Sequence, residues 1–414
     1  MKLQPRSFFS DEAWFWAVAL GALALGFSVR FLIFAYALED ADEVIYHSLV
    51  DNIVRGKGYS LHGHPLLEQV WMSKAMYDSP VFFHPPVGIY FFWLVQGVVG
   101  LDIAGIKAAQ LVCYVIFFLS GLGVLRLVFP KPSLPLKMAF PVLLAFTPIY
   151  AHTNMKVWID NPRLAFLMLH FFFCLLLLRN KGSGVFGLAA LTSMLSPFTK
   201  VDALLAMPFL YGVVWSMETS KEWRKKLALF FSALLALNGL GVAWWLLYSE
   251  ALKYGPGRPS EELMAVNEFV RFATKMMSTR KFLVDYLKLL TTLVPSLIVI
   301  SACALQGGWK SWKSSLMKLG PRVFLFGWVL SHFLVYWYLA EHGYSKLIRY
   351  LLMTVPASLL LFAYAVEDLR ANPKRTWFTA GLAVLLFVAF QSEVLHGVRT
   401  MIFGTNDAMV YPVF

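Results

Sequence analysis

The sequence is short of the residues that keep a globular protein in water. Charged side chains make up only 14% of the 414 residues, while 59% are hydrophobic. A water-soluble domain carries about 25% charged residues, so this composition excludes that class. The apolar residues gather in long runs separated by short polar linkers. We therefore expect an all-α polytopic membrane protein.

Cysteine is also scarce. The three cysteines, Cys113, Cys174 and Cys303, all lie inside apolar runs. This placement indicates packing residues and supports neither disulfides nor a thiolate metal site. The sequence also has no glycine-rich phosphate loop, internal repeat or low-complexity tract, so a soluble nucleotide-sugar donor is unsupported.

The positive charge is not arranged for nucleic acid. The net charge is +12, but Lys and Arg residues lie in short clusters between apolar runs, where the positive-inside rule expects them. No basic face alternates with stacking aromatic residues, as nucleic-acid binding would need. We therefore expect no nucleic-acid partner.

The apolar runs predict about 11 transmembrane helices, several of them short enough to require tilt. Their ranges are 13–38, 106–125, 138–150, 162–178, 184–199, 203–217, 227–249, 282–304, 323–341, 350–366 and 377–393. The first run is longer than a signal-peptide core, so we interpret it as an uncleaved span. Five basic linkers can all be cytoplasmic at once. They begin at Arg126, Arg179, Lys221, Lys310 and Arg370.

If these five linkers are cytoplasmic, the remaining loops all lie on the non-cytoplasmic face. They are the acidic loop 39–84, the Asp160 linker, the Lys200 turn, the loop 250–281 and the turn 342–349. Segment 85–100 is apolar enough to cross, but a crossing there would invert every later loop. We predict that it lies along or dips into the outer leaflet, within a first external loop over 39–105.

The first external loop opens with a helical pattern. Apolar side chains recur at helical spacing between 45 and 54. The opposite row is polar and consists of Glu43, His47, Asp51 and Arg55. This predicts an amphipathic juxtamembrane helix, which Asp40 would cap and which Gly56 and Gly58 would end.

Two adjacent carboxylates, Asp42 and Glu43, lie where the first span ends. Carboxylates at an apolar boundary are costly unless they have a task. One such task is that of a general base, which deprotonates a hydroxyl or an amine. A solvated helix cap is the alternative, and spacing alone does not decide between the two.

Five stretches together resemble one known family. They are DADEVIYHSLVDNIVRGKGYS, FFHPPVGIYFFWL, WIDNPRLAF, LSPFTKVDALLAMP and LIRYLLMTVPASLLL. In this order they resemble the polyprenyl-phosphate-dependent glycosyltransferases of the GT-C fold, nearest the protein O-mannosyltransferase and lipid A aminoarabinose transferase group. The resemblance runs through most of the chain. It implies a single integral-membrane domain over 1–414.

The resemblance implies roles for four residues of the external loops. Asp42 matches the residue that activates the acceptor, and Glu43 supports acceptor or donor binding. Asp160 matches a second family carboxylate near the substrate, although its position also suits a helix N-cap. His84, in a His-Pro-Pro motif, matches an active-site wall residue.

Four further positions concern the lipid phosphate. Lys200, at a turn between short spans, can neutralise a phosphate as a point charge, or can simply pair with Asp202. Arg349 and Tyr350 match a family position near the phosphate; the alternative for the arginine is snorkelling. Arg258 belongs to the basic loop 250–281, whose family counterpart helps to cover the donor, although nearby glutamates could balance its charge.

A divalent metal site is conceivable in the first loop. Its candidate ligands are His47, His62, His64, His84, Glu68 and Asp78. No fixed ligand spacing supports such a site, and the resemblance implies no required cofactor. The metal ligands, if any, are therefore unassigned.

The resemblance implies a glycosyltransferase that moves a sugar, with inversion, from a polyprenyl- or dolichyl-phosphate donor. The acceptor, a glycan, lipid or protein, would be met on the non-cytoplasmic face of a cell or inner membrane. The chain leaves little room for a soluble acceptor domain, so we expect external loops to select the acceptor or the acceptor to be small. The alternative is a lipid transporter or flippase, since boundary charges also mark transport paths.

Overall fold

The computed structural model describes residues 11–35, 38, 41–64, 79–100, 103–254, 320–341 and 348–371. These residues are mostly helical, and no strand occurs among them. Four helices are long and apolar enough to cross a membrane. They span Asp11–Ala35, Ile103–Val128, Leu134–Ala151 and Lys221–Ser249. The chain is therefore an integral membrane protein, as its composition predicted.

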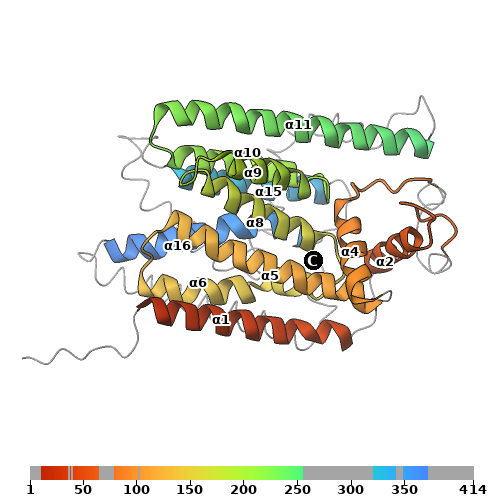
Figure 1. The fold of residues 1–414 in the computed structure, drawn as a ribbon, viewed down its shortest axis with the longest axis horizontal. Helices are drawn as coiled ribbons and strands as arrows, with labels where there is room; N and C mark the ends of the chain where they lie inside the picture. Colours follow the sequence, from red (N-terminus) through yellow and green to blue (C-terminus); the bar gives the residue numbers. More distant parts are fainter. Residues whose placement is uncertain are drawn as a thin grey trace, which may run out of the picture.

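These helices and several shorter ones lie side by side in one bundle, with their axes roughly horizontal in Figure 1. They are α1 (Asp11–Arg30), α5 (Ile103–Val128), α6 (Leu134–Phe146), α8 (Asp160–Leu176), α9 (Ser183–Leu195), α10 (Ala203–Met217), α11 (Lys221–Tyr254), α15 (Pro321–Glu341) and α16 (Val355–Ala371). Helix α5 packs on α8, α4, α1 and α6 and occupies the interior. Helices α1 and α11 form the two outer edges of the view and expose leucine and tryptophan side chains, as expected of surfaces that face lipid.

The predicted spans fall on these helices with three differences. The first span continues as the short helix η1 (Phe31–Ala35), and the span 138–150 is divided, since α6 ends and α7 (Pro148–Asn154) begins at Pro148. Span 350–366 starts as the 3-10 helix η4 (Ile348–Thr354) before α16. Spans 282–304 and 377–393 lie outside the described residues, so the predicted number of spans stays a prediction.

Two helices of the first external loop lie at one end of the bundle. They are α2 (Ala41–Val54) and α4 (Val87–Val99), and α4 runs across the direction of the long helices in Figure 1. Helix α2 matches the predicted amphipathic helix, although its cap residue Asp40 lies outside the described residues. The orientation of α4 agrees with the expectation that 85–100 does not cross, which stays a prediction.

Helix α2 ends as its glycines predicted. The N–H of Lys57 donates to the carbonyl of Asn52, and that of Gly56 donates to Ile53. Gly56 has a φ of 74°, which is the left-handed conformation that closes a Schellman motif. The chain then turns back, and Asp51 binds His64 at 2.8 Å, which fixes the return segment against the helix.

A buried cation fastens the start of the bundle. Arg30, on α1, is fully buried; its Nε donates to Asn154 Oδ1 at 2.7 Å and its Nη2 to the carbonyl of Ala145 at 2.7 Å. The guanidinium lies 4.0 Å above the ring of Tyr114. These neutral partners connect α1 with α5, α6 and α7, so Arg30 serves as a structural fastener.

Candidate functional site

Charged side chains meet at the end of the bundle that α2 and α4 cover. The turn 155–159 before α8 and the turn 196–202 before α10 come together there. Gly88 allows α4 to pack closely on the second of these turns, because a Cβ atom at that position would lie 2.6 Å from the side chain of Thr199. The N–H of Val87 also donates to the carbonyl of Phe198 at 2.9 Å. Helix α4 therefore lies directly on the Lys200 turn.

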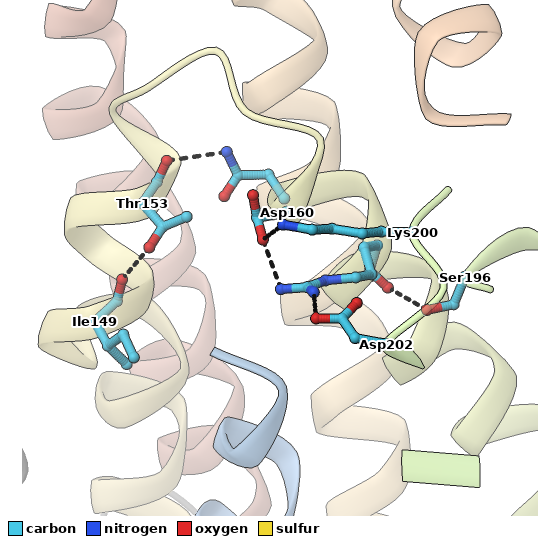
Figure 2. A network of polar contacts seen from close by, with 8 residues as sticks. Ile149, Thr153, Asp160, Ser196, Lys200 and Asp202 are labelled. Carbon is cyan, nitrogen blue, oxygen red and sulfur yellow. Dashed lines mark hydrogen bonds and ion pairs between the residues drawn. The ribbon is translucent and has the colours of Figure 1, made fainter. Parts of the chain in front are cut away.

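Asp160 is the centre of a buried ion cluster. It is fully buried in the first turn of α8, and its Oδ1 accepts hydrogen bonds from Lys200 Nζ at 3.1 Å and Arg163 Nη2 at 2.6 Å (Figure 2). The N-cap of α8 is Ile159, with no side-chain cap bond. The capping interpretation of Asp160 is therefore wrong: this carboxylate binds cations.

Arg163 joins the two carboxylates of the cluster. It follows Asp160 by three residues, so the two side chains share one helix face. Its Nη1 binds Oδ2 of Asp202, the residue that immediately precedes α10. The structure therefore does not show the alternative pair of Lys200 with Asp202. Arg163 binds Asp202, and Lys200 binds Asp160. We did not predict Arg163; an arginine one turn after Asp160 in an apolar helix was the available signal.

Further hydrogen bonds hold the turns that carry the cluster (Figure 2). Ser196 Oγ donates to the carbonyl of Arg163 at 2.8 Å, which fastens the Lys200 turn to α8. Asn161 Nδ2 donates to the carbonyls of Thr153 at 3.0 Å and Lys156 at 3.1 Å. A buried ion network is stable only when its remaining hydrogen-bonding groups are also satisfied, and these bonds supply part of that support.

The adjacent carboxylates of α2 have different surroundings. Glu43 is 3% exposed; its Oε1 accepts the N–H of Val157 at 2.8 Å and its Oε2 lies 3.7 Å from Lys156 Nζ. Glu43 belongs to the predicted polar face of α2, but it is buried against the turn before α8 and does not face solvent. Asp42 is half-buried and lies closer to solvent than Glu43. Of the two, Glu43 holds the turn before Asp160.

His84 lies in a group of aromatic side chains beside the Lys200 turn. Its ring centroid is 4.1 Å from that of Phe83, and its carbonyl accepts the hydroxyl of Tyr59 at 3.0 Å. The indole of Trp245, on α11, donates to the carbonyl of Phe83 at 3.0 Å. The segment 82–86 is thus held by Tyr59, in the loop after α2, and by Trp245 of α11, and it leads directly into α4, so it can form a wall.

The remaining predicted donor residues are only partly described. Arg349 and Tyr350 belong by their backbone to η4, which packs on α7 and α8, next to the elements that carry Asp160. Their side chains lie outside the described part of the chain, and so does Arg258 with most of the loop 250–281. The structure therefore brings together Glu43, Asp160 and Lys200, places His84 beside the Lys200 turn, and does not describe the side chains of Arg258, Arg349 and Tyr350.

Within the described ranges no group of three or more His, Cys, Asp or Glu side chains could hold an ion. Glu68 and Asp78 lie outside those ranges.

Two polar side chains of α2 have shifted pKa values. Burial would raise the pKa of Asp51, but the hydrogen bonds from His64 and Arg55 outweigh it and lower that pKa. Burial lowers the pKa of His47.

No family model and no curated protein sequence matches this chain. Among solved structures it is similar to the oligosaccharyltransferase AglB from Archaeoglobus fulgidus in complex with an inhibitory peptide and a dolichol-phosphate, with a TM-score of 0.57 and 13% identity over 95% of this chain. The chain spans 56% of AglB, little more than half its length. A complex of the same enzyme contains Zn and sulfate, with a TM-score of 0.58 and 13% identity, covering 93% of this chain and 53% of the enzyme.

A second similar protein is ArnT from Cupriavidus metallidurans bound to undecaprenyl phosphate. The TM-score is 0.53 and the identity 12%, over 94% of this chain and 76% of ArnT. Identities this low show likeness of fold, which extends over nearly the whole chain. The helices, including α2 and α4 at the end of the bundle, therefore form the GT-C fold that the sequence resemblance implied.

Proposed function

We propose that the chain is a membrane glycosyltransferase that moves a sugar from a polyprenyl- or dolichyl-phosphate carrier to an acceptor on the non-cytoplasmic face. The observation that carries this proposal is the ion cluster at the end of the bundle where α2 and α4 lie, in which Asp160 and Arg163 are fully buried while the side chains of Lys200 and Asp202 stay 11% and 29% exposed. A fixed group of charges at one end of a GT-C bundle suits a ligand with an apolar tail and a phosphate at the membrane boundary.

Lys200 is the cation of the cluster that is best placed to meet the donor phosphate. Arg163 is fully buried between two carboxylates, whereas the side chain of Lys200 keeps 11% of its surface exposed. A lysine ammonium can also turn from one anion to another as a point charge. Asp160 would orient Lys200 rather than act as the base, since two cations bind it. Arg258, Arg349 and Tyr350 complete the proposed donor site.

Asp42 is the proposed general base. It is less buried than Glu43 and so lies nearer to the surface from which a hydroxyl or amine of the acceptor would approach. The acceptor oxygen or nitrogen would form a bond to the anomeric carbon on the face opposite the phosphate. The bond between that carbon and the phosphate oxygen would break, Asp42 would take the acceptor's proton, and the free lipid phosphate would leave. This displacement inverts the anomeric centre.

The opposite end of the bundle supports the proposed orientation. There Glu12, at the start of α1, binds Arg126 at 2.5 Å and Lys137 at 3.0 Å. These cations belong to the first of the five basic linkers that the positive-inside rule places in the cytoplasm. Since α5 runs from α4 to Arg126, a cytoplasmic Arg126 would put α2, α4 and the ion cluster on the non-cytoplasmic side.

The proposal is tested with purified protein in lipid nanodiscs. The donors are undecaprenyl-phosphate mannose and undecaprenyl-phosphate aminoarabinose, each labelled in the sugar, with envelope lipid extract as acceptor. We expect release of free undecaprenyl phosphate and labelled product, with Lys200→Ala and Asp42→Asn as deficient variants. Movement of intact donor across a vesicle bilayer without cleavage would instead favour a flippase.

A further inference from the structure

His332, on α15, is a buried polar side chain that the proposed mechanism does not use. It is 4% exposed, and its Nδ1 lies 3.0 Å from the carbonyl of Trp328. A carbonyl only accepts hydrogen bonds, so Nδ1 carries a hydrogen and Nε2 of the neutral ring is an acceptor. Among the described residues, Nε2 has no hydrogen-bond partner.

The packing of α15 on α10 places His332 beside the ion cluster. Phe324 covers Gly212, and Phe209 covers Gly327, so the two helices run antiparallel. Continuing from this register brings His332 to the level of residue 204, at the turn that carries Asp202. His332 accordingly interacts electrostatically with Asp202 and Arg163.

Asp202 has an unused acceptor of its own. Its Oδ2 binds Arg163, while its Oδ1 is buried and has no hydrogen-bond partner in the described part of the chain. The imidazole of His332 and the carboxylate of Asp202 therefore both act on the guanidinium of Arg163, and each has one buried acceptor atom without a hydrogen-bond partner among the described residues. Two acceptors cannot bond to each other, but one added proton makes Nε2 a donor to the carboxylate.

The charge of the cluster shows when such a proton would be bound. Asp160 and Asp202 balance Arg163 and Lys200, so the four charges sum to zero. A phosphate bound at Lys200 adds negative charge to a buried region, and added negative charge favours the protonated form of a neighbouring imidazole. The bound ligand would therefore shift His332 toward its charged form.

We propose that binding of a polyprenyl phosphate takes up one proton from solvent and that the His332–Asp202 pair holds it, with Nε2–H donating to Oδ1. The inference rests on the proposed function, because it assumes that this cluster receives the phosphate. The step is an association in which no covalent bond forms or breaks.

Other described groups packed on α15 offer no competing site for the proton. Residues 351–363 of η4 and α16 contain no titratable side chain. On α10, the hydroxyl of Tyr211 is hydrogen-bonded to Nε2 of His170, on α8. Among the described residues, Asp202 and Arg163 are the charged groups that act electrostatically on His332. The protonated imidazole is a positioning group here, because it holds Asp202 and acts on the ligand through Arg163.

The test is calorimetric titration of the full chain in nanodiscs with undecaprenyl phosphate, at one pH in buffers of different ionisation enthalpy. A phosphate monoester itself titrates near pH 6, so the measured quantity is the difference in proton uptake between wild type and His332→Gln. We expect about one proton more for wild type, and a wild-type affinity that falls with rising pH, by up to about tenfold per pH unit, over the pH range in which this uptake is measured. His62→Gln, in the exposed first loop, is the matched control and should behave as wild type.

Asp202→Asn provides a second variant should His332→Gln fail to fold, and it should also lose the uptake. Equal uptake in wild type and in a folded variant would overturn the inference while leaving the proposed function standing. No binding of undecaprenyl phosphate to wild type would overturn both. His332→Asn separates packing from proton binding, because it keeps a donor for Trp328 but has no group at Nε2; wild-type uptake in this variant would contradict the assignment.

Discussion

Glu43 on α2 accepts a hydrogen bond from the backbone N–H of Val157, with 2.8 Å between Oε1 and N. This contact joins the first external loop to the turn that precedes Asp160. The catalytic carboxylate that we propose, Asp42, is the neighbour of Glu43 in the chain. One hydrogen bond thus fixes the distance between the proposed base and the proposed phosphate cluster.

The first prediction concerns this bond. Glu43→Gln keeps an amide oxygen for the N–H of Val157, whereas Glu43→Ala leaves that buried N–H without its acceptor. We expect Glu43→Ala to lower the free energy of unfolding by about 1–3 kcal/mol and Glu43→Gln to cost less. Thermal unfolding in nanodiscs measures both. Equal stability of the two variants would show that the bond contributes nothing.

The second prediction concerns Asp42. Asp42→Asn keeps the shape of the side chain but cannot take the acceptor's proton, so turnover should fall about 10²–10⁴-fold. Donor affinity should stay near that of wild type. Asp40→Asn is the matched control, because asparagine caps a helix about as well as aspartate. Retention of more than roughly a third of wild-type turnover would lie outside that range and would move the role of base to Asp160.

The third prediction separates Lys200 from Arg163. Lys200→Ala should weaken binding of undecaprenyl phosphate with little loss of stability, and Lys253→Ala should weaken it less, because solvent screens a charge on a wet loop. Arg163→Met removes the shared partner of two carboxylates and should cost about 3–5 kcal/mol of stability. Binding constants and unfolding curves for all three variants decide the matter. A folded Lys200→Ala protein with wild-type affinity would place the phosphate elsewhere.

The fourth prediction concerns topology. If 85–100 does not cross, position 102 lies on the same side of the membrane as Asp42. We expect Asp102→Cys, in a cysteine-free background, to react with an impermeant maleimide from the non-cytoplasmic side only. Position 131, in a basic linker, should react from the cytoplasmic side. Labelling of position 102 from the cytoplasm alone would invert the scheme.

The fifth prediction concerns acid stability of the first external loop. The pKa of His47 is lowered from 6.5, so the unfolded loop binds the proton more readily. The stabilisation is present above about pH 6.5 and is lost as the pH falls through the lower folded value. Asp51, whose pKa is lowered from 3.8, repeats this loss at more acidic pH. Hydrogen exchange of α2 between pH 7 and 5 measures the first step, and His47→Gln should remove it.

Periodicity and charge placement predicted most of the fold, because a membrane helix is defined by local apolar length. The spans at α5, α10 and α15 and the amphipathic helix α2 show this. The division of span 138–150 between α6 and α7 at Pro148 was not predicted, because hydropathy is similar on both sides of such a break. The wrong cap assignment of Asp160 has a similar cause: local spacing cannot reveal Lys200, which lies 40 residues away in the chain.

The candidate site was predicted in part. The resemblance supplied Asp42, Glu43, Asp160 and Lys200, but the partners that hold them could not be read from spacing. Val157 binds Glu43 through its backbone, which no side-chain pattern reports. His332 depends on the register of α15 against α10, which is set by glycine contacts between distant segments. Such relationships exist only after packing.

Arg30 has a consequence for how the protein is made. Its partner Asn154 follows it by 124 residues, so synthesis at about 5–20 residues per second separates the two by roughly 6–25 s. During that interval α1 has left the ribosome while its guanidinium has none of its bonds to α6 and α7. The long arginine side chain can reach the headgroup region in the meantime. We therefore expect the guanidinium of Arg30 to be solvated in the headgroup region until α6 and α7 supply its bonds.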